Sequence, residues 1–72
     1  MADRATPPEI SDDIFTLLGV RRDGIASIVD LMPAGSLEAV RVRAAWLLSE
    51  HASCHLVEVW RGGAMVEEFA RT

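Results

Sequence analysis

The sequence lacks several residue types, and each absence narrows what the chain can do. Lysine and tyrosine are absent, so all seven basic residues are arginines. Cys54 is the only cysteine, which excludes an intramolecular disulfide. Together with His51 and His55 it offers too few and too crowded ligands for a closed zinc site, which takes four. We therefore expect a chain that folds without metal, disulfide or cofactor.

Long apolar runs and a basic surface are also missing. No stretch of about 18 apolar residues is present, so we expect no transmembrane helix. The N-terminal residues lack the apolar core of a secretory signal, and a cytoplasmic protein is the expected class. A formal net charge of −4 disfavours direct contact with nucleic acid, which requires a basic face. An acidic chain is better suited to a basic protein partner.

Seventy-two residues, half of them hydrophobic, predict one small domain. We expect residues 1–9 to be a disordered tail, because they contain Pro7, Pro8 and small polar residues. Residues 10–72 form the predicted domain. A chain of this length buries only about 60% of its unfolded surface, so its stability is marginal. Since we expect neither a disulfide nor a bound metal, oligomerisation is the remaining way to stabilise so short a chain, and we expect a homodimer.

The strongest secondary-structure signal is a helix over residues 36–50. The Ser36 hydroxyl can cap its first turn, and Glu38 suits the positive end of the helix dipole. A helical wheel with about 100° per residue separates two stripes. The predicted core stripe consists of Leu37, Val40, Ala44, Leu47 and Leu48. The outer stripe, on the opposite side, consists of Ala39, Val42 and Trp46.

The apolar outer stripe has two explanations. The N-terminal segment around Pro8 and Ile10 could fold over it, or the stripe could contact a partner or a second copy of the chain. We favour the second explanation. A two-fold contact between helices removes Trp46 from water on both subunits at once, so we expect Trp46 at a dimer interface.

A hairpin is predicted before the helix. Residues 10–20 fit both a short helix and a buried strand. The Asp23-Gly24 turn that follows favours a strand over residues 15–21, because Asp-Gly readily supplies a positive φ. Residues 25–32, rich in β-branched side chains, form the second strand of this hairpin.

A second hairpin is predicted after the helix. Residues 54–60 and 64–70 read as strands around Gly62-Gly63, since two glycines tolerate the positive φ of a tight turn. The order strand, strand, helix, strand, strand predicts an α+β fold. We expect a ββαββ domain: a four-stranded, mainly antiparallel sheet with one helix packed on one face.

A two-residue turn at Gly62-Gly63 also predicts the pairing of the side chains. Trp60 then faces Met65, Glu58 faces Glu67, and Leu56 faces Phe69. One sheet face would carry those four apolar residues around two carboxylates, with Val57, Val59 and Val66 under the helix. A register change of one residue would dissolve the carboxylate pair. The predicted interface residues are Ala39, Val42, Trp46, Leu56, Trp60, Met65 and Phe69, with Glu58 and Glu67 as partner-docking carboxylates.

The chain contains an Asp-Gly turn, an Ala-rich helix with a Leu-Leu-Ser-Glu-His end, and a Cys-x-x-Val-Glu-Val-Trp-x-Gly strand and turn. Over Asp23 to Phe69 it resembles a group of short alphaproteobacterial proteins that combine these motifs. The resemblance implies the ββαββ fold and a cytoplasmic location but no activity. The residues that carry the resemblance are Asp23, Gly24, Leu47, Leu48, Ser49, Glu50, His51, Cys54, Val57, Glu58, Val59, Trp60 and Gly62.

Two constellations could carry chemistry. Glu58 and Glu67 could act as general acid and base, but opposed like charges are destabilising unless something neutralises them. The corner of His51, Cys54 and His55 could hold a nucleophile or a metal. No acid is placed to orient a histidine there, and Cys54 fits a small buried hydrophobe equally well.

The sequence therefore favours a small acidic protein-interaction module that is not an enzyme. A more specific version is an inhibitor of a nucleic-acid-processing enzyme, of the anti-CRISPR kind that mobile elements carry, with a basic nucleic-acid-binding protein as partner. The alternative is a small enzyme or metal-binding factor that uses Glu58 and Glu67 or the histidine–cysteine corner.

Overall fold

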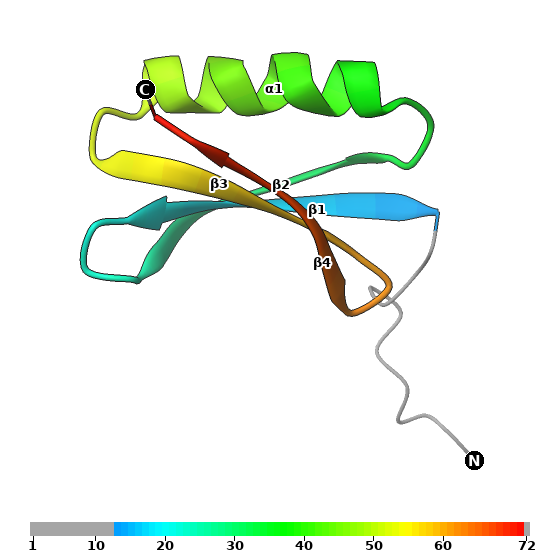
Figure 1. Ribbon diagram of the computed structural model, residues 1–72, viewed down its shortest axis with the longest axis horizontal. Helices are drawn as coiled ribbons and strands as arrows, with labels where there is room; N and C mark the ends of the chain where they lie inside the picture. The colour runs from blue at the N-terminus through cyan, green and yellow to red at the C-terminus, as the bar shows by residue number, and fades with distance from the viewer. Residues whose placement is uncertain (1–12, 72) are drawn as a thin grey trace.

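The computed structural model describes residues 13–71, in which one helix lies across one face of a four-stranded sheet (Figure 1). All neighbouring strands are antiparallel, and their order across the sheet is β2-β1-β3-β4. This confirms the predicted α+β fold. The predicted N-terminal tail, residues 1–9, lies outside the described residues, as does Ile10. The elements are β1 (Ile14–Arg21), β2 (Ala26–Pro33), α1 (Leu37–Glu50), β3 (Cys54–Arg61) and β4 (Ala64–Ala70).

The segment before the Asp23-Gly24 turn, which fitted both a helix and a strand, forms strand β1, as that turn predicted. β1 is central in the sheet and buries Phe15 and Leu17 toward α1, so period-two alternation satisfies the core. In the turn, Gly24 has a φ of +87°. The Asp23 carboxylate accepts a hydrogen bond from the Ile25 N–H at 3.1 Å, which fixes the return of the chain into β2.

The helix begins and packs largely as predicted. The Ser36 hydroxyl accepts a hydrogen bond from the Ala39 N–H at 3.3 Å, and four of the five core-stripe residues are buried. The fifth prediction was wrong, since Leu37 is 49% exposed. A helical wheel gives direction around the axis but not position along it. Leu37 has the core direction but lies in the first turn, at the end of the helix.

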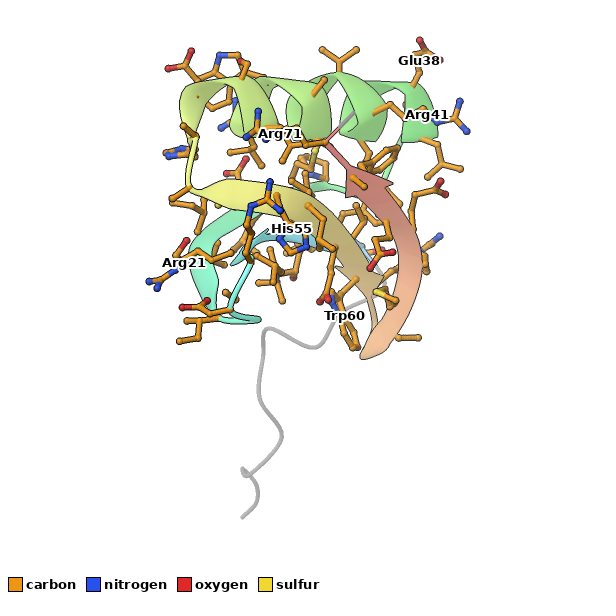
Figure 2. The ribbon with its side chains drawn as sticks, turned by 60° about the vertical axis from the view of Figure 1, so that its left-hand side comes forward. Arg21, Glu38, Arg41, His55, Trp60 and Arg71 are labelled. Atoms are coloured by element: carbon orange, nitrogen blue, oxygen red, sulfur yellow. The ribbon has the colours of Figure 1, made fainter. Side chains whose placement is uncertain are left out.

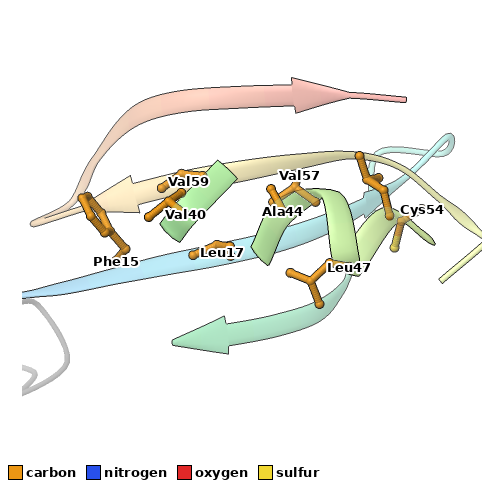
Figure 3. Close-up of a cluster of buried hydrophobic side chains, with 9 residues drawn as sticks. Phe15, Leu17, Val40, Ala44, Leu47, Cys54, Val57 and Val59 are labelled. Atoms are coloured by element: carbon orange, nitrogen blue, oxygen red, sulfur yellow. The ribbon is translucent and has the colours of Figure 1, made fainter. Parts of the chain in front are cut away.

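The core lies between α1 and the two central strands (Figure 3). Leu17, Val40, Val57 and Val59 are completely buried, and each such side chain stabilises the fold by about 1.5–3 kcal/mol. No polar side chain is buried in this layer of the described chain. The buried residues of this cluster are Phe15 and Leu17 from β1, Val40, Ala44, Leu47 and Leu48 from α1, and Cys54, Val57 and Val59 from β3.

Gly19 in β1 permits a close approach of its neighbours. A Cβ atom at this position would lie 3.0 Å from the Cys54 Sγ and 3.0 Å from the Ile28 Cβ, distances that real Cβ contacts rarely show. The Cys54 sulfur of β3 and the Ile28 side chain of β2 thus pack directly over Gly19, which has no side chain of its own. Gly19 is a packing requirement rather than a turn residue.

Arg71 closes the C-terminal end of the helix, which has no basic residue in its own last turn. Its guanidinium group donates to the carbonyl oxygens of Leu48, of His51 at 3.1 Å and of Cys54 at 2.8 Å (Figure 2). The last carbonyls of a helix have no partner within the helix, and a cation suits their negative end of the dipole. Arg71 therefore ties the end of β4 to α1 and to the start of β3.

Candidate functional site

The second hairpin has the predicted turn but a different register. Gly62 and Gly63 have φ values of +59° and +87°, and Trp60 faces Met65 as expected. Beyond that pair, a β-bulge inserts Val66 in β4, so that Val59 faces Glu67. A one-residue insertion sends every later side chain of the strand to the opposite face.

The predicted carboxylate pair is therefore wrong in one member. Glu58 faces Glu68, and Glu67 lies on the helix side of the sheet, where it faces Val59. Two acids still face one another across the hairpin, because Glu68 occupies the position opposite Glu58 that was predicted for Glu67. No sequence signal marks the bulge, since Val66 is an ordinary strand residue and the turn glycines are accounted for without it.

The bulge also redistributes three apolar residues. Leu56 faces Ala70, not Phe69 as predicted. Phe69 faces Val57 and packs against the core, so it does not belong to the uncovered side of the sheet. Val66, expected under the helix, is exposed. The cause is the same insertion, which exchanges the two faces of β4 after Met65.

The sheet face turned away from α1, hereafter the open face, is apolar. Cross-strand pairing places Leu18 between Val29 of β2 and Glu58 of β3, and it places Thr16 between Leu31 and Trp60. Val29 is 65% exposed and Leu31 57%. Figure 1 shows no helix over this face. Its apolar members are Ile14, Leu18, Val20, Val29, Leu31, Leu56, Trp60 and Met65.

Sequence reasoning missed the contribution of β2 to this face. The alternation of Ile28, Asp30 and Met32 toward the helix leaves Val29 and Leu31 on the other side, and both sides are apolar. The sequence contains this alternation, but apolar residues on both faces of a strand give no preference for which face is buried. A pocket of about 330 Å³, lined by Asp13, Ile14, Leu31, Met32 and Pro33, lies at the end of β2.

The two carboxylates lie beside this apolar surface. The Trp60 indole N–H donates to the Glu58 carboxylate at 3.0 Å, which orients both groups on the open face (Figure 2). Three arginines of the described chain are engaged elsewhere: Arg21 pairs with Asp23, Arg43 pairs with Asp30, and Arg71 binds backbone carbonyls. Glu58 and Glu68 face one another across the hairpin and form a pair of acidic side chains at one side of the apolar surface.

The histidine–cysteine corner combines a buried cysteine with two half-buried histidines. Cys54 is 2% exposed, and its Sγ lies 3.6 Å from the Ser27 Oγ, in the core layer. His55 is the inserted residue of a second bulge, between the Val20–Leu56 and Arg21–Cys54 pairs. Its Nδ1 is buried and has no hydrogen-bond partner in the described chain. Among residues 13–71, no three His, Cys, Asp or Glu side chains come together in a way that could hold a metal.

The outer stripe of the helix is exposed, as the wheel predicted, but its tryptophan is partly covered. Val42 is 64% exposed and Trp46 45%. The guanidinium carbon of Arg43 lies 4.4 Å from the centroid of the Trp46 ring, and the same side chain forms an ion pair with Asp30 of β2. An exposed cation–π contact of this kind stabilises by about 0.5–1 kcal/mol. The chain itself therefore shields part of the indole.

Comparison of the chain with protein-family models, with curated proteins and with solved structures gives no match. Within residues 13–71, the single helix is too short to cross a membrane.

Proposed function

We propose that the protein is a non-enzymatic protein-binding module whose binding surface is the open face. The observation that supports this most strongly is the exposure of Val29, Leu31 and Met65 on a face that no described element covers. An antiparallel sheet with one solvated face normally carries polar side chains there. Contiguous exposed apolar surface is typical of a contact site.

The carboxylates define the chemistry of the partner. Glu58 and Glu68 face one another, and like charges in a directly opposed pair destabilise the strand pairing. A guanidinium or ammonium group from a partner would neutralise both and would find apolar surface beside it. The net charge of −4 adds long-range attraction to a cation. The open face therefore suits a partner segment that presents arginine or lysine among apolar side chains.

A basic nucleic-acid-binding protein is the partner class that fits this chemistry. Such proteins expose arginine and lysine where they contact phosphates. A small acidic chain that occupies this surface would compete with nucleic acid and act as an inhibitor. Acidity, small size and the position of the carboxylates support this more specific proposal.

A synthetic peptide of alternating leucine and arginine tests the proposal, with a leucine–glutamate peptide of equal length as its counterpart. We expect only the basic peptide to bind, with an affinity that falls toward 1 M salt, where the Debye length is about 3 Å. Met65→Arg should weaken binding about tenfold, equal to 1.4 kcal/mol, because it adds a charge of the same sign as the basic peptide's beside Glu58 and Glu68. Val42→Arg is the matched control, because it changes the net charge equally but lies on the exposed side of the helix. Equal binding of both peptides, or equal losses in both variants, would contradict the proposal.

A further inference from the structure

The two edges of the sheet differ in how they are protected against pairing with another strand. β4 carries Glu67 and Glu68 on its two faces and contains the Val66 bulge. Charges and bulges on an edge strand discourage pairing with other chains. β2 has a bulge at Ser27, near its start, but residues 28–32 pair regularly with β1, and their one charged residue, Asp30, is engaged by Arg43. The less protected edge of the sheet is therefore β2.

The hydrogen-bonding direction of β2 follows from a single contact at its end. The Ala34 N–H donates to the Asp13 carbonyl at 2.9 Å, which makes these residues a hydrogen-bonded pair. Hydrogen-bonded and non-bonded pairs alternate along antiparallel strands. Met32 and Asp30 therefore direct their backbone groups toward β1. Val29 and Leu31, in the alternate positions, direct their N–H and C=O groups away from the sheet.

We propose that β2 pairs antiparallel with β2 of a second copy, so that one continuous sheet runs through a two-fold dimer. Antiparallel pairing of a strand with itself is self-complementary, as a two-fold interface requires. The apolar, uncharged edge suits an identical edge. The one carboxylate of this edge, on Asp30, is balanced by Arg43 of the same chain, so two copies of the edge meet without an unpaired charge.

The side chains select the position of the two-fold axis. An axis at Asp30 would place two carboxylates directly opposite one another, which is destabilising. An axis at Leu31 would place Pro33, which has no N–H, opposite the outward N–H of Val29. An axis at Val29 avoids both conflicts and makes Val29 a hydrogen-bonded pair with its own counterpart. This register also brings the open faces of the two copies onto the same side of the sheet, as one larger apolar surface.

Disulfide trapping tests this register. Hydrogen-bonded antiparallel partners have Cα atoms about 5.5 Å apart, within the range of about 4.4–6.8 Å that a disulfide spans. Val29→Cys should therefore form a covalent dimer under mild oxidation. The wild-type chain controls for Cys54, which is buried, and Val42→Cys controls for exposure, since Val42 is 64% exposed and Val29 65%. A yield for Val29→Cys no higher than for Val42→Cys would overturn the proposal, as would faster trapping of Leu31→Cys.

A second variant removes the need for any new disulfide. Val29→Lys places two ammonium groups opposite one another on the axis, and the exposure of Val29 makes the fold tolerant of the change. We expect the wild type to sediment as a dimer at high micromolar concentration and Val29→Lys as a folded monomer. A wild-type monomer, or a Val29→Lys dimer of unchanged affinity, would refute the pairing. The proposed binding function is probed through Met65 on β4, so failure of one proposal is distinguishable from failure of the other.

Discussion

The guanidinium group of Arg71 and the carbonyl oxygen of Leu48 join the end of the last strand to the last turn of the helix. The same group also donates to His51 and Cys54, so one side chain satisfies carbonyls from the helix, the connecting segment and β3. The last turn of α1 contains no basic residue of its own, so Arg71 supplies a cation at the negative end of the helix dipole.

Arg71→Ala should therefore lower the free energy of unfolding by about 1–2 kcal/mol, a value below the sum of its bonds because the side chain is partly solvated. Urea denaturation followed by circular dichroism measures the change. Arg22→Ala, in the exposed turn of the first hairpin, is the control and should have little effect. Equal stability of the two variants would contradict a capping role for Arg71.

Gly19→Ala should destabilise the protein by about 1–3 kcal/mol, because the new methyl group meets Cys54 and Ile28 at 3.0 Å. Cys54→Ala removes the sulfur from this contact. The double variant should be less destabilised than the sum of the two single variants, since the two sites share one space. Strict additivity in thermal denaturation would show that the sulfur is not the obstacle.

Glu68→Gln should stabilise the protein by about 0.2–1 kcal/mol, since it removes the charge that faces Glu58 across the hairpin. Glu67→Gln is the matched control: it changes the net charge equally but faces Val59. The difference between the two variants should shrink in high salt, where exposed charges are screened. If Glu67→Gln were the stabilising change, the hairpin would have the register without the bulge.

Trp46→Arg should leave the fold intact, because the indole lies off the core and packs only on Arg43 among the ring contacts of the described chain. The variant also separates two dimer geometries. If β2 forms the interface, Trp46→Arg sediments as a dimer and Val29→Lys as a monomer. The reverse pattern would contradict pairing through β2 and would support the helix-to-helix contact that the sequence suggested.

Local signals predicted most of the fold. The Ser36 cap, the Asp23-Gly24 turn and the Gly62-Gly63 turn each act within a few residues, so their chemistry can be read from the chain. The helical wheel correctly identified four buried residues of the helix: Val40, Ala44, Leu47 and Leu48. It failed at Leu37 because it contains no information on where the helix ends relative to the sheet.

Long-range features could not be predicted in the same way. The Val66 bulge depends on how two strands fit over a shared core, and it exchanged the places of Glu67 and Glu68. The Arg71 cap joins residues 23 positions apart in the sequence, and nothing near Arg71 points to a helix end. The open face was expected from the second hairpin alone. Its most exposed members, Val29 and Leu31, come from the first.

The two tryptophans offer the most direct test of the account, because one lies on each candidate surface. Trp60 is on the open face with its N–H on Glu58, and Trp46 is on the outer side of the helix. Their indole N–H resonances in a ¹⁵N-labelled sample report on the two surfaces separately during titration with the leucine–arginine peptide. We predict a saturable shift of the Trp60 signal and an unchanged Trp46 signal. A shift of Trp46 with Trp60 unchanged would contradict binding at the open face.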